Sequence, residues 1–194
     1  MLNRLPGGVG DSVRATARLL DGRANASVLD IGTGSGDFVR RLVGKRAVRV
    51  IAADLRREVL EVTARNLRDT SNVTLLQADA RSLPLDDRSV DVAHASLLLH
   101  HFDPGDAVIA LREMRRVARS GVVINDLRRS RLAFAGTAVA VLALSHGRYT
   151  RHDGVLSARR AYTLAELDGI AAAAGLTVAW RSWGAMPRVT TVYR

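Results

Sequence analysis

The sequence predicts an α/β domain built on a seven-stranded, mostly parallel sheet with helices on both faces. Short runs of apolar and β-branched residues alternate along the chain with longer segments that repeat apolar residues at helical spacing. The short runs are apolar throughout, which is typical of parallel strands covered on both faces. No internal repeat or low-complexity linker interrupts this pattern, so we expect residues 1–194 to form a single domain.

The first two thirds of the chain contain five of the expected strands and the helices that connect them. The strands are expected at residues 27–31, 48–53, 73–77, 90–95 and 121–125. Helices are expected at residues 38–43, 58–67 and 107–118, with arginines on the faces opposite the apolar residues. Asp103 and Pro104 provide a cap and a proline for the start of the third helix. A helix over residues 1–20 is expected to lie over the ligand-binding side of the sheet.

The last third contains an apolar run, a basic loop, one more helix and two final strands. The apolar run, 132–144, is shorter than the ~20 residues that cross a bilayer. It predicts either a buried helix or an apolar cover over a pocket, and the loop 145–160 follows it. A capping box of Thr163 and Glu166 opens a helix that Gly175 ends. Strands at about 177–181 and 189–193 complete the sheet.

Composition excludes several kinds of chemistry. The chain has no cysteine, which rules out disulfides, thiolate metal sites and cysteine nucleophiles. No clustered histidines and carboxylates suggest a metal site. The net charge is +10, but the basic residues, of which Lys45 is the only lysine, are dispersed along the chain, so a nucleic-acid partner is possible without being favoured. The N-terminal residues lack the apolar segment of a secretory signal, which predicts a cytoplasmic location.

The most informative segment is residues 28–38, VLDIGTGSGDF, in which a buried strand is followed by three alternate glycines and then by a helix. Glycines at such a turn permit backbone angles that other residues avoid, and they let a ligand approach closely. The helix N-terminus behind them presents free N–H groups. A dinucleotide site has the spacing G-x-G-x-x-G, which is absent here. Asp37 beside the turn would repel a pyrophosphate, whereas a cationic ligand suits it better.

Acidic residues also follow the next two strands. Asp54 ends the second strand, where a carboxylate can accept hydrogen bonds from both hydroxyls of an adenosine ribose. Asp79 follows the third strand, where it could accept a hydrogen bond from the exocyclic amine of adenine. A single acid at a strand end is more often a cap or turn residue. Three of them at successive strand ends, counting Asp30, favour a ligand site.

These segments resemble the class I S-adenosylmethionine (SAM)-dependent methyltransferases of Rossmann-like fold, and are similar to the small-molecule methyltransferases of ubiquinone and menaquinone biosynthesis. The resemblance rests on VLDIGTGSGDF, AADL (52–55), QADARSLPLDDRSVDVAHASLLLHHF (77–102) and GVVINDLRRS (121–130). It implies SAM as the cofactor, with S-adenosylhomocysteine as the product. The cofactor-binding residues that it implies lie at the strand ends: Asp30, Gly32, Thr33, Gly34, Gly36 and Ser96 on the methionine side, and Asp54, Leu55, Asp79 and Ala80 around the ribose and adenine.

The acceptor has to be inferred from other residues. The fourth strand is not followed by the proline-aromatic loop that amino-directed methyltransferases use, which makes adenine and glutamine N-methylation unfavoured. An oxygen or carbon of a hydrophobic, polyketide- or quinone-like small molecule is the best remaining acceptor. His101, and less strongly His100, are candidate catalytic bases because they lie just beyond a strand end and an imidazole titrates near neutral pH. The alternative interpretation is structural: one or both histidines only pack against or cap the following helix.

The segment 127–160 is expected to be an insertion at the acceptor site. Its arginines could bind a carboxylate, a phosphate or the phosphopantetheine of a carrier protein, or could simply be solvated. Three other functions stay open. An RNA methyltransferase would explain the positive charge, although only 4% of the residues are aromatic. A SAM-binding module without catalysis and a nicotinamide-dependent reductase are the other two.

Overall fold

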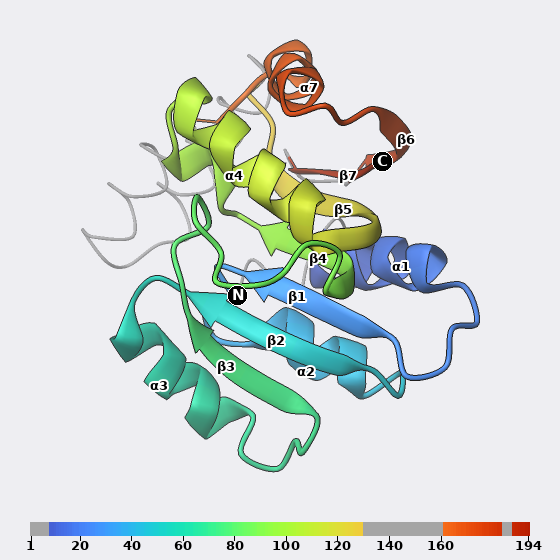
Figure 1. The fold of residues 1–194 in the computed structure, drawn as a ribbon, viewed down its shortest axis with the longest axis vertical. Coiled ribbons are helices and arrows are strands. Elements are labelled where there is room, and N and C mark those ends of the chain that lie inside the picture. Colours follow the sequence, from blue (N-terminus) through green and yellow to red (C-terminus); the bar gives the residue numbers. More distant parts are fainter. Residues whose placement is uncertain (1–7, 130–160, 184–187) are drawn as a thin grey trace, which may run out of the picture.

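The computed structural model of this chain describes residues 8–129, 161–183 and 188–194. Within them the sheet has seven strands in the order β3-β2-β1-β4-β5-β7-β6 (Figure 1). The strands are β1 Ser27–Ile31, β2 Arg49–Asp54, β3 Val73–Gln77, β4 Val90–Ser96, β5 Ala118–Leu127, β6 Val178–Trp183 and β7 Arg188–Tyr193. The first five run parallel, and β7 pairs antiparallel with both β5 and β6. The predicted fold class is therefore confirmed.

The helices divide between the two faces of the sheet. They are α1 Val9–Leu20, α2 Asp37–Val43, α3 Arg57–Asn66, α4 Pro104–Val117 and α7 Leu164–Ala173, with the short 3-10 helix η2 Leu99–His101 before α4. α1 and α2 share one hydrophobic cluster with the sheet, whereas α4 and α7 share the other. Figure 1 shows α4 in front of the sheet with α2 behind it. None of these described helices has the length and apolar character required to cross a membrane.

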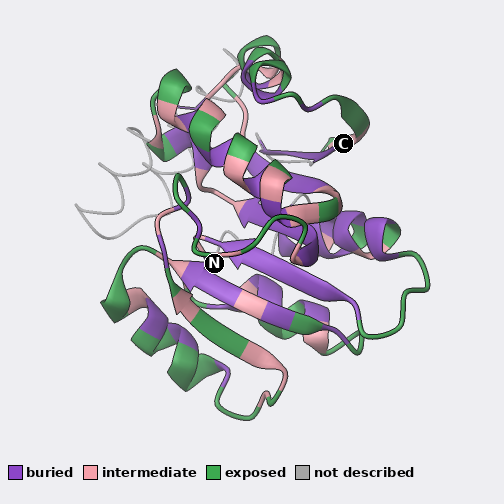
Figure 2. Cartoon of the chain, in the orientation of Figure 1, coloured by how far each residue is buried: buried purple, intermediate pink, exposed green. Residues whose placement is uncertain are grey.

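The central strands provide most of the core. β1, β4 and β7 are buried along almost their whole length (Figure 2). The expectation that every strand is covered on both faces is wrong for β3, where Thr74 and Leu75 are exposed. β3 pairs only with β2 and forms one edge of the sheet, so one of its sides has no neighbouring strand. Its apolar sequence did not distinguish an edge strand from a central one.

Residues 9–20 of the predicted N-terminal helix form α1, whose position differs from the expected one, while residues 1–7 lie outside the described residues. α1 packs against α2, β4 and β5 on a face of the sheet and does not cover the ligand-binding edge. Its buried side chains, among them Val13 and Leu20, belong to the cluster under α2. Only its N-terminal end reaches the carboxyl edge of the sheet, where Asn125 Nδ2 donates to the Gly8 carbonyl at 3.1 Å. The apolar stripe of α1 is long enough to require a sheet face, which is the physical reason for the difference.

Local capping signals in the sequence are confirmed. The Asp103 side chain accepts a hydrogen bond from the backbone of Asp106, and Pro104 begins α4. Thr163 and Glu166 form the complete capping box of α7. The apolar run 132–144 and the basic loop 145–160 lie outside the described residues.

Candidate functional site

The turn between β1 and α2 has the backbone that its glycines predict. Gly32, Gly34 and Gly36 have φ angles of 68°, 57° and 79°, a region that favours glycine. α3 holds this turn from the side. Thr63 Oγ1 donates to the Gly34 carbonyl at 2.6 Å, and Asn66 Nδ2 donates to the Ser35 carbonyl at 2.9 Å. The glycine turn is therefore fixed by side chains of α3.

The turn borders a hollow of about 860 Å³ at the carboxyl edge of the sheet, which we call the first hollow. It lies where the strand order reverses between β1 and β4, the usual place for ligands in open α/β sheets. Six residues that the sequence proposed for cofactor binding line it: Gly32, Gly34, Asp54, Leu55, Asp79 and Ala80. Other described residues of its lining include Arg56, Arg81, Leu98, His101 and Phe102.

Asp54 lies where the end of β2 meets the glycine turn. Its Oδ2 accepts a long hydrogen bond of 3.4 Å from the backbone N–H of Gly34, and its Oδ1 accepts one of 3.1 Å from the backbone of Arg56. The carboxylate is thus oriented by two backbone donors and stays half-exposed to the hollow. It has remaining acceptor capacity for a ligand that presents hydroxyls.

Four other proposed cofactor residues do not line the first hollow. Thr33 and Gly36 are buried parts of the turn, and Gly36 precedes α2 as its cap. Ser96, at the end of β4, accepts a hydrogen bond of 3.0 Å from Arg188 Nη2. Asp30 is 2% exposed and accepts a hydrogen bond of 2.8 Å from Thr33 Oγ1. Its carboxylate therefore supports the glycine turn from beneath the hollow.

His94 is the second partner of Asp30. Its Nδ1 lies 2.7 Å from Asp30 Oδ1 across the β1–β4 pairing, and the imidazole is fully buried. The ring stacks on Phe38 of α2, with the two ring centroids 3.6 Å apart. Nε2 of this imidazole has no hydrogen-bond partner among the described residues. No sequence motif indicates this pair, because it depends on the strand register.

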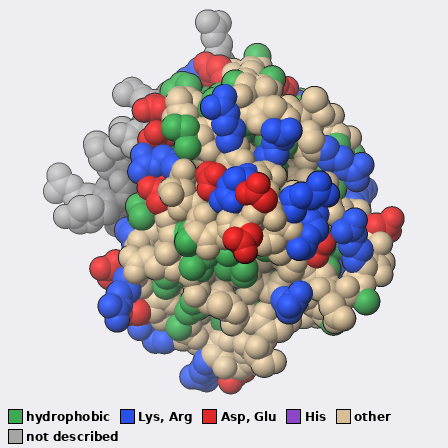
Figure 3. All heavy atoms as spheres, viewed as in Figure 1, with side chains coloured by type: hydrophobic (Ala, Val, Ile, Leu, Met, Phe, Trp, Pro, Cys, Tyr) green, Lys and Arg blue, Asp and Glu red, His purple; other side chains and the backbone are tan. Residues whose placement is uncertain are grey.

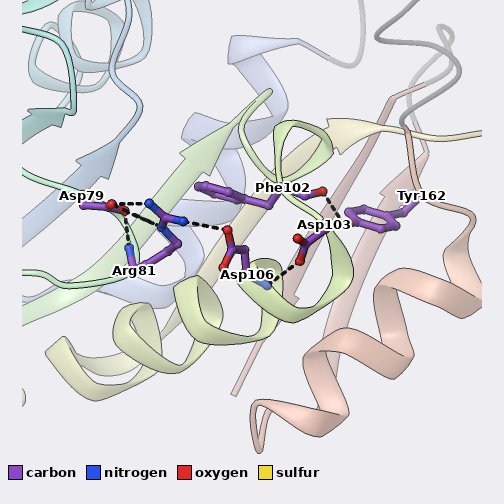
Figure 4. A network of polar contacts seen from close by, with 6 residues as sticks. All are labelled: Asp79, Arg81, Phe102, Asp103, Asp106 and Tyr162. Carbon is purple, nitrogen blue, oxygen red and sulfur yellow. Dashed lines mark hydrogen bonds and ion pairs between the residues drawn. The ribbon is translucent and has the colours of Figure 1, made fainter.

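Asp79 and Arg81, which line the first hollow, belong to an ionic network (Figure 4). Arg81 binds both carboxylate oxygens of Asp79 and reaches Asp106 of α4 through Nη1 at 2.7 Å. Hydrogen bonds from the Arg81 side chain and backbone hold the pKa of Asp79 below its usual range. Figure 4 also shows the Tyr162 hydroxyl donating to the Phe102 carbonyl, at 2.8 Å. The network connects the loop after β3 to the start of α4.

A second hollow, of about 780 Å³, adjoins the first between α4 and α7. His101 and Phe102 line both hollows. The other lining residues come from the two helices and their flanks: His100, Asp103, Pro104, Val108, Arg129, Tyr162, Glu166, Gly169, Ile170 and Ala173. His101 is the exposed imidazole at this junction. It can accept a proton from a molecule in the second hollow while another molecule occupies the first.

The two neighbouring histidines differ in their surroundings. His101 is exposed, whereas His100 is buried and its Nδ1 lies 2.6 Å from Asp126 Oδ1. Asp126 also accepts the His100 backbone N–H at 3.2 Å. The two imidazole rings lie against each other, with their centroids 4.1 Å apart. Asp126 therefore fixes the His100 ring, and the His100 ring packs against that of His101.

A buried arginine lies at the same edge of the sheet. Arg188 is 4% exposed and donates through Nε to Asn125 Oδ1 at 3.0 Å, in addition to its bond to Ser96. Desolvation lowers the pKa of this guanidinium, and the nearby Asp126 carboxylate opposes the effect. Arg188 ties the start of β7 to the ends of β4 and β5.

Sequence reasoning missed several of these residues. The segment around Asp126 stood out, but its pairing with His100 could not be read from it. Thr63 and Asn66 belong to α3, whose sequence has only the pattern of an ordinary amphipathic helix and gives no sign of their contacts with the glycine turn. Arg81 was also missed, although the sequence offers a signal for it, because an arginine two residues after an acid at a turn can reach back to that acid.

The known proteins that this chain resembles include methyltransferases. A family model described as "Methyltransferase domain" matches residues 28–121. Ubiquinone/menaquinone biosynthesis C-methyltransferase UbiE of Hahella chejuensis is 40% identical over 105 residues, which are 51% of this chain and 41% of that protein. The UbiE protein of Shewanella frigidimarina is 35% identical over 114 residues, covering 56% and 44%. The chain thus spans less than half the length of these curated relatives.

Solved structures match over nearly the whole chain. A SAM-dependent methyltransferase from Aquifex aeolicus has a TM-score of 0.70 at 19% identity, covering 94% of this chain and 88% of that one. Mitomycin 7-O-methyltransferase MmcR has a TM-score of 0.71 at 19% identity, covering 95% and 53%. At such identities the likeness establishes a shared fold.

Proposed function

We propose that this chain, which has the fold of the class I SAM-dependent methyltransferases and resembles the UbiE enzymes in sequence, transfers a methyl group from SAM to an oxygen or carbon of a hydrophobic small molecule. The observation that carries the proposal is the pair of adjoining hollows, one bordered by the glycine turn and the other by His101. In this proposal residues 1–194 form one methyltransferase domain, and 127–160 is its acceptor-side insertion.

The residues of the first hollow fit SAM. The glycine turn leaves room for a ligand beside its backbone, and the Asp54 carboxylate can accept both ribose hydroxyls. Asp79 and Ala80 would take the adenine. The acids at this edge suit a ligand whose sulfonium and amino groups are cationic. Asp30, Thr33, Gly36 and Ser96 would act from behind the turn and the strand ends.

SAM supplies a methyl group on a sulfonium, which is a good leaving group, so the protein mainly has to position the acceptor and remove its proton. His101 would accept the proton of a hydroxyl or enol in the second hollow as the methyl group moves to that oxygen or carbon. His100, fixed by Asp126, would position the His101 ring. Val108 and Ile170 provide apolar lining for a hydrophobic acceptor.

The acceptor class is inferred from the similar proteins and from the charge of the surface. The similar proteins are named for ubiquinone/menaquinone biosynthesis and for mitomycin methylation, and these are small molecules. On the face drawn in Figure 3 basic side chains have acidic ones between them, which does not favour an extended nucleic-acid surface on that face. A quinone- or polyketide-like acceptor, free or bound to a carrier protein, is therefore preferred over RNA.

The test is a methyl-transfer assay with radiolabelled SAM against a panel of hydroxyquinones, phenols and total RNA. We expect transfer to a phenolic or enolic member of the panel, detected by mass as one added methyl group. The His101→Gln variant should lower kcat by about 10²-fold or more and change its pH profile, because a positioned base contributes that much. Val108→Ala is the matched control, expected to raise only the acceptor KM. Transfer to RNA alone would overturn the proposal.

A further inference from the structure

The carboxylate of Asp79 is held more firmly than a residue at a loop normally is. Arg81 approaches Oδ1 with its backbone N–H at 2.9 Å and with Nε at 3.1 Å. Nη2 of the same guanidinium lies 2.7 Å from Oδ2. This fork fixes the plane of the carboxylate as well as its position, which a lysine could not do.

The guanidinium is itself anchored from its other end. Nη1 donates to Asp106 Oδ2 at 2.7 Å, and Asp106 belongs to the first turn of α4. Arg81 thus bridges two acids that belong to different elements, as Figure 4 shows. The three side chains are between 30% and 41% exposed, a setting in which ion pairs contribute little to stability. Stability alone is therefore a weak reason for the arrangement.

The location gives a better reason. Asp79 and Arg81 both line the first hollow, on the side where the adenine of SAM would lie. Three donors of Arg81 reach the Asp79 carboxylate, and Nε is shared between Oδ1 at 3.1 Å and Oδ2 at 3.2 Å. A carboxylate has about four acceptor positions, so three donors leave capacity for one hydrogen bond from a ligand. A carboxylate without a proton can only accept. It therefore accepts a hydrogen bond from an exocyclic amine and repels an exocyclic carbonyl oxygen.

We propose that Arg81 is a specificity-determining positioning residue that holds Asp79 as a fixed acceptor for the exocyclic amine of the cofactor's base. This inference rests on the proposed function, because it assumes that the first hollow takes an adenine nucleoside. Arg81 acts through Asp79, and the tie to Asp106 keeps it from swinging into solvent. The hollow accordingly selects a 6-aminopurine over a 6-oxopurine.

The test is a calorimetric titration with two ligands that differ at this one group, S-adenosylhomocysteine and S-inosylhomocysteine. We expect the wild type to prefer the amine form, and Arg81→Ala to reduce the affinity ratio by about tenfold, the scale of one charged hydrogen bond. Arg81→Lys should restore only part of the ratio. Asp79→Asn should favour the oxo form, because its amide can donate. Arg40→Ala removes a comparable exposed ion pair with Asp37 on α2 and should leave the ratio unchanged.

Each alternative outcome has a distinct meaning. An equal fold-loss of affinity for both ligands in Arg81→Ala leaves the ratio unchanged, would assign Arg81 a structural role only and would overturn the inference. Unchanged affinity for both ligands would overturn it as well. A wild type that binds both ligands equally would also overturn it, while the proposed cofactor site would stand. A wild type that binds neither ligand would overturn the proposed function itself. If Arg81→Ala melts before the titration temperature, Arg81→Gln serves for the same comparison.

Discussion

The ionisation of Tyr193 gives a prediction about stability at high pH. The composition of the chain helps to separate this titration from that of other groups. The phenol lies at the end of β7, fully buried in the cluster under α4 and α7, with its hydroxyl 3.4 Å from Asp168 Oδ1. Burial raises the pKa of Tyr193 to about 12, and the Asp168 carboxylate adds to the effect. Few other groups titrate in this range, because Lys45 is the only lysine and the chain has no cysteine.

The magnitude follows from the difference between the folded and unfolded states. Unfolded Tyr193 ionises near its usual pKa of about 10, whereas the folded protein keeps the proton until about pH 12. A raised pKa gives stability that is complete below pH 10 and is lost as the pH rises through 12. Each pH unit is worth roughly 1.4 kcal/mol, so the free energy of unfolding should fall by about 3 kcal/mol in this window.

The perturbation is Tyr193→Phe, which keeps the ring and removes the titrating group. Urea unfolding can be monitored by the fluorescence of Trp180 and Trp183, both on the neighbouring strand β6. The wild type should lose stability between pH 10 and 12 relative to Tyr193→Phe. Tyr162, whose pKa burial also raises, is present in both proteins and cancels in the comparison. Parallel curves for the two proteins would refute the reasoning.

Two further predictions concern the core. His94→Phe leaves the buried Asp30 carboxylate without its imidazole partner and should lower the free energy of unfolding by about 3 kcal/mol in urea titrations. Asp30→Asn can still accept the hydrogen bond and should lower the free energy of unfolding by less. Equal losses of stability in the two variants would contradict this reasoning. Gly121→Ala would place a methyl group 2.6 Å from the Tyr193 carbonyl oxygen at a φ of 149°, so we expect a loss of about 2 kcal/mol or more. Gly169→Ala, with open space around it, should instead stabilise α7 by about 1 kcal/mol, and a similar effect at both glycines would argue against the expected clash at Gly121.

Local features of this fold were predictable from sequence because their signals are local. The glycine turn needs only backbone conformation, and the caps at Asp103 and Thr163 need only contacts within one helical turn. The alternation of short apolar segments with helical ones was sufficient to predict a parallel sheet. The glycine turn and Asp54 could be assigned to the carboxyl edge of the sheet from sequence, because each follows or ends a strand.

Long-range contacts were not predictable. Asp30 and His94 are 64 residues apart and meet only because β1 and β4 pair in one particular register. The pairing of His100 with Asp126 joins η2 to β5 over 26 residues, and Arg188 of β7 reaches Asn125 of β5 over 63 residues. A shift of one residue in either register would turn these side chains to the opposite face. Hydrophobic pattern alone does not specify that register when both faces are buried.

The central claim is that the first hollow binds an adenosine cofactor through Asp54. The most direct test is a calorimetric titration of the wild type, Asp54→Ala and Asp54→Asn with S-adenosylhomocysteine. We expect the wild type to bind in the micromolar range and Asp54→Ala to lose most of that affinity, because the ribose hydroxyls lose their acceptor. Asp54→Asn, which keeps one oxygen toward the Gly34 turn, should fall between them. Absence of binding by the wild type, or equal binding by Asp54→Ala, would contradict the account.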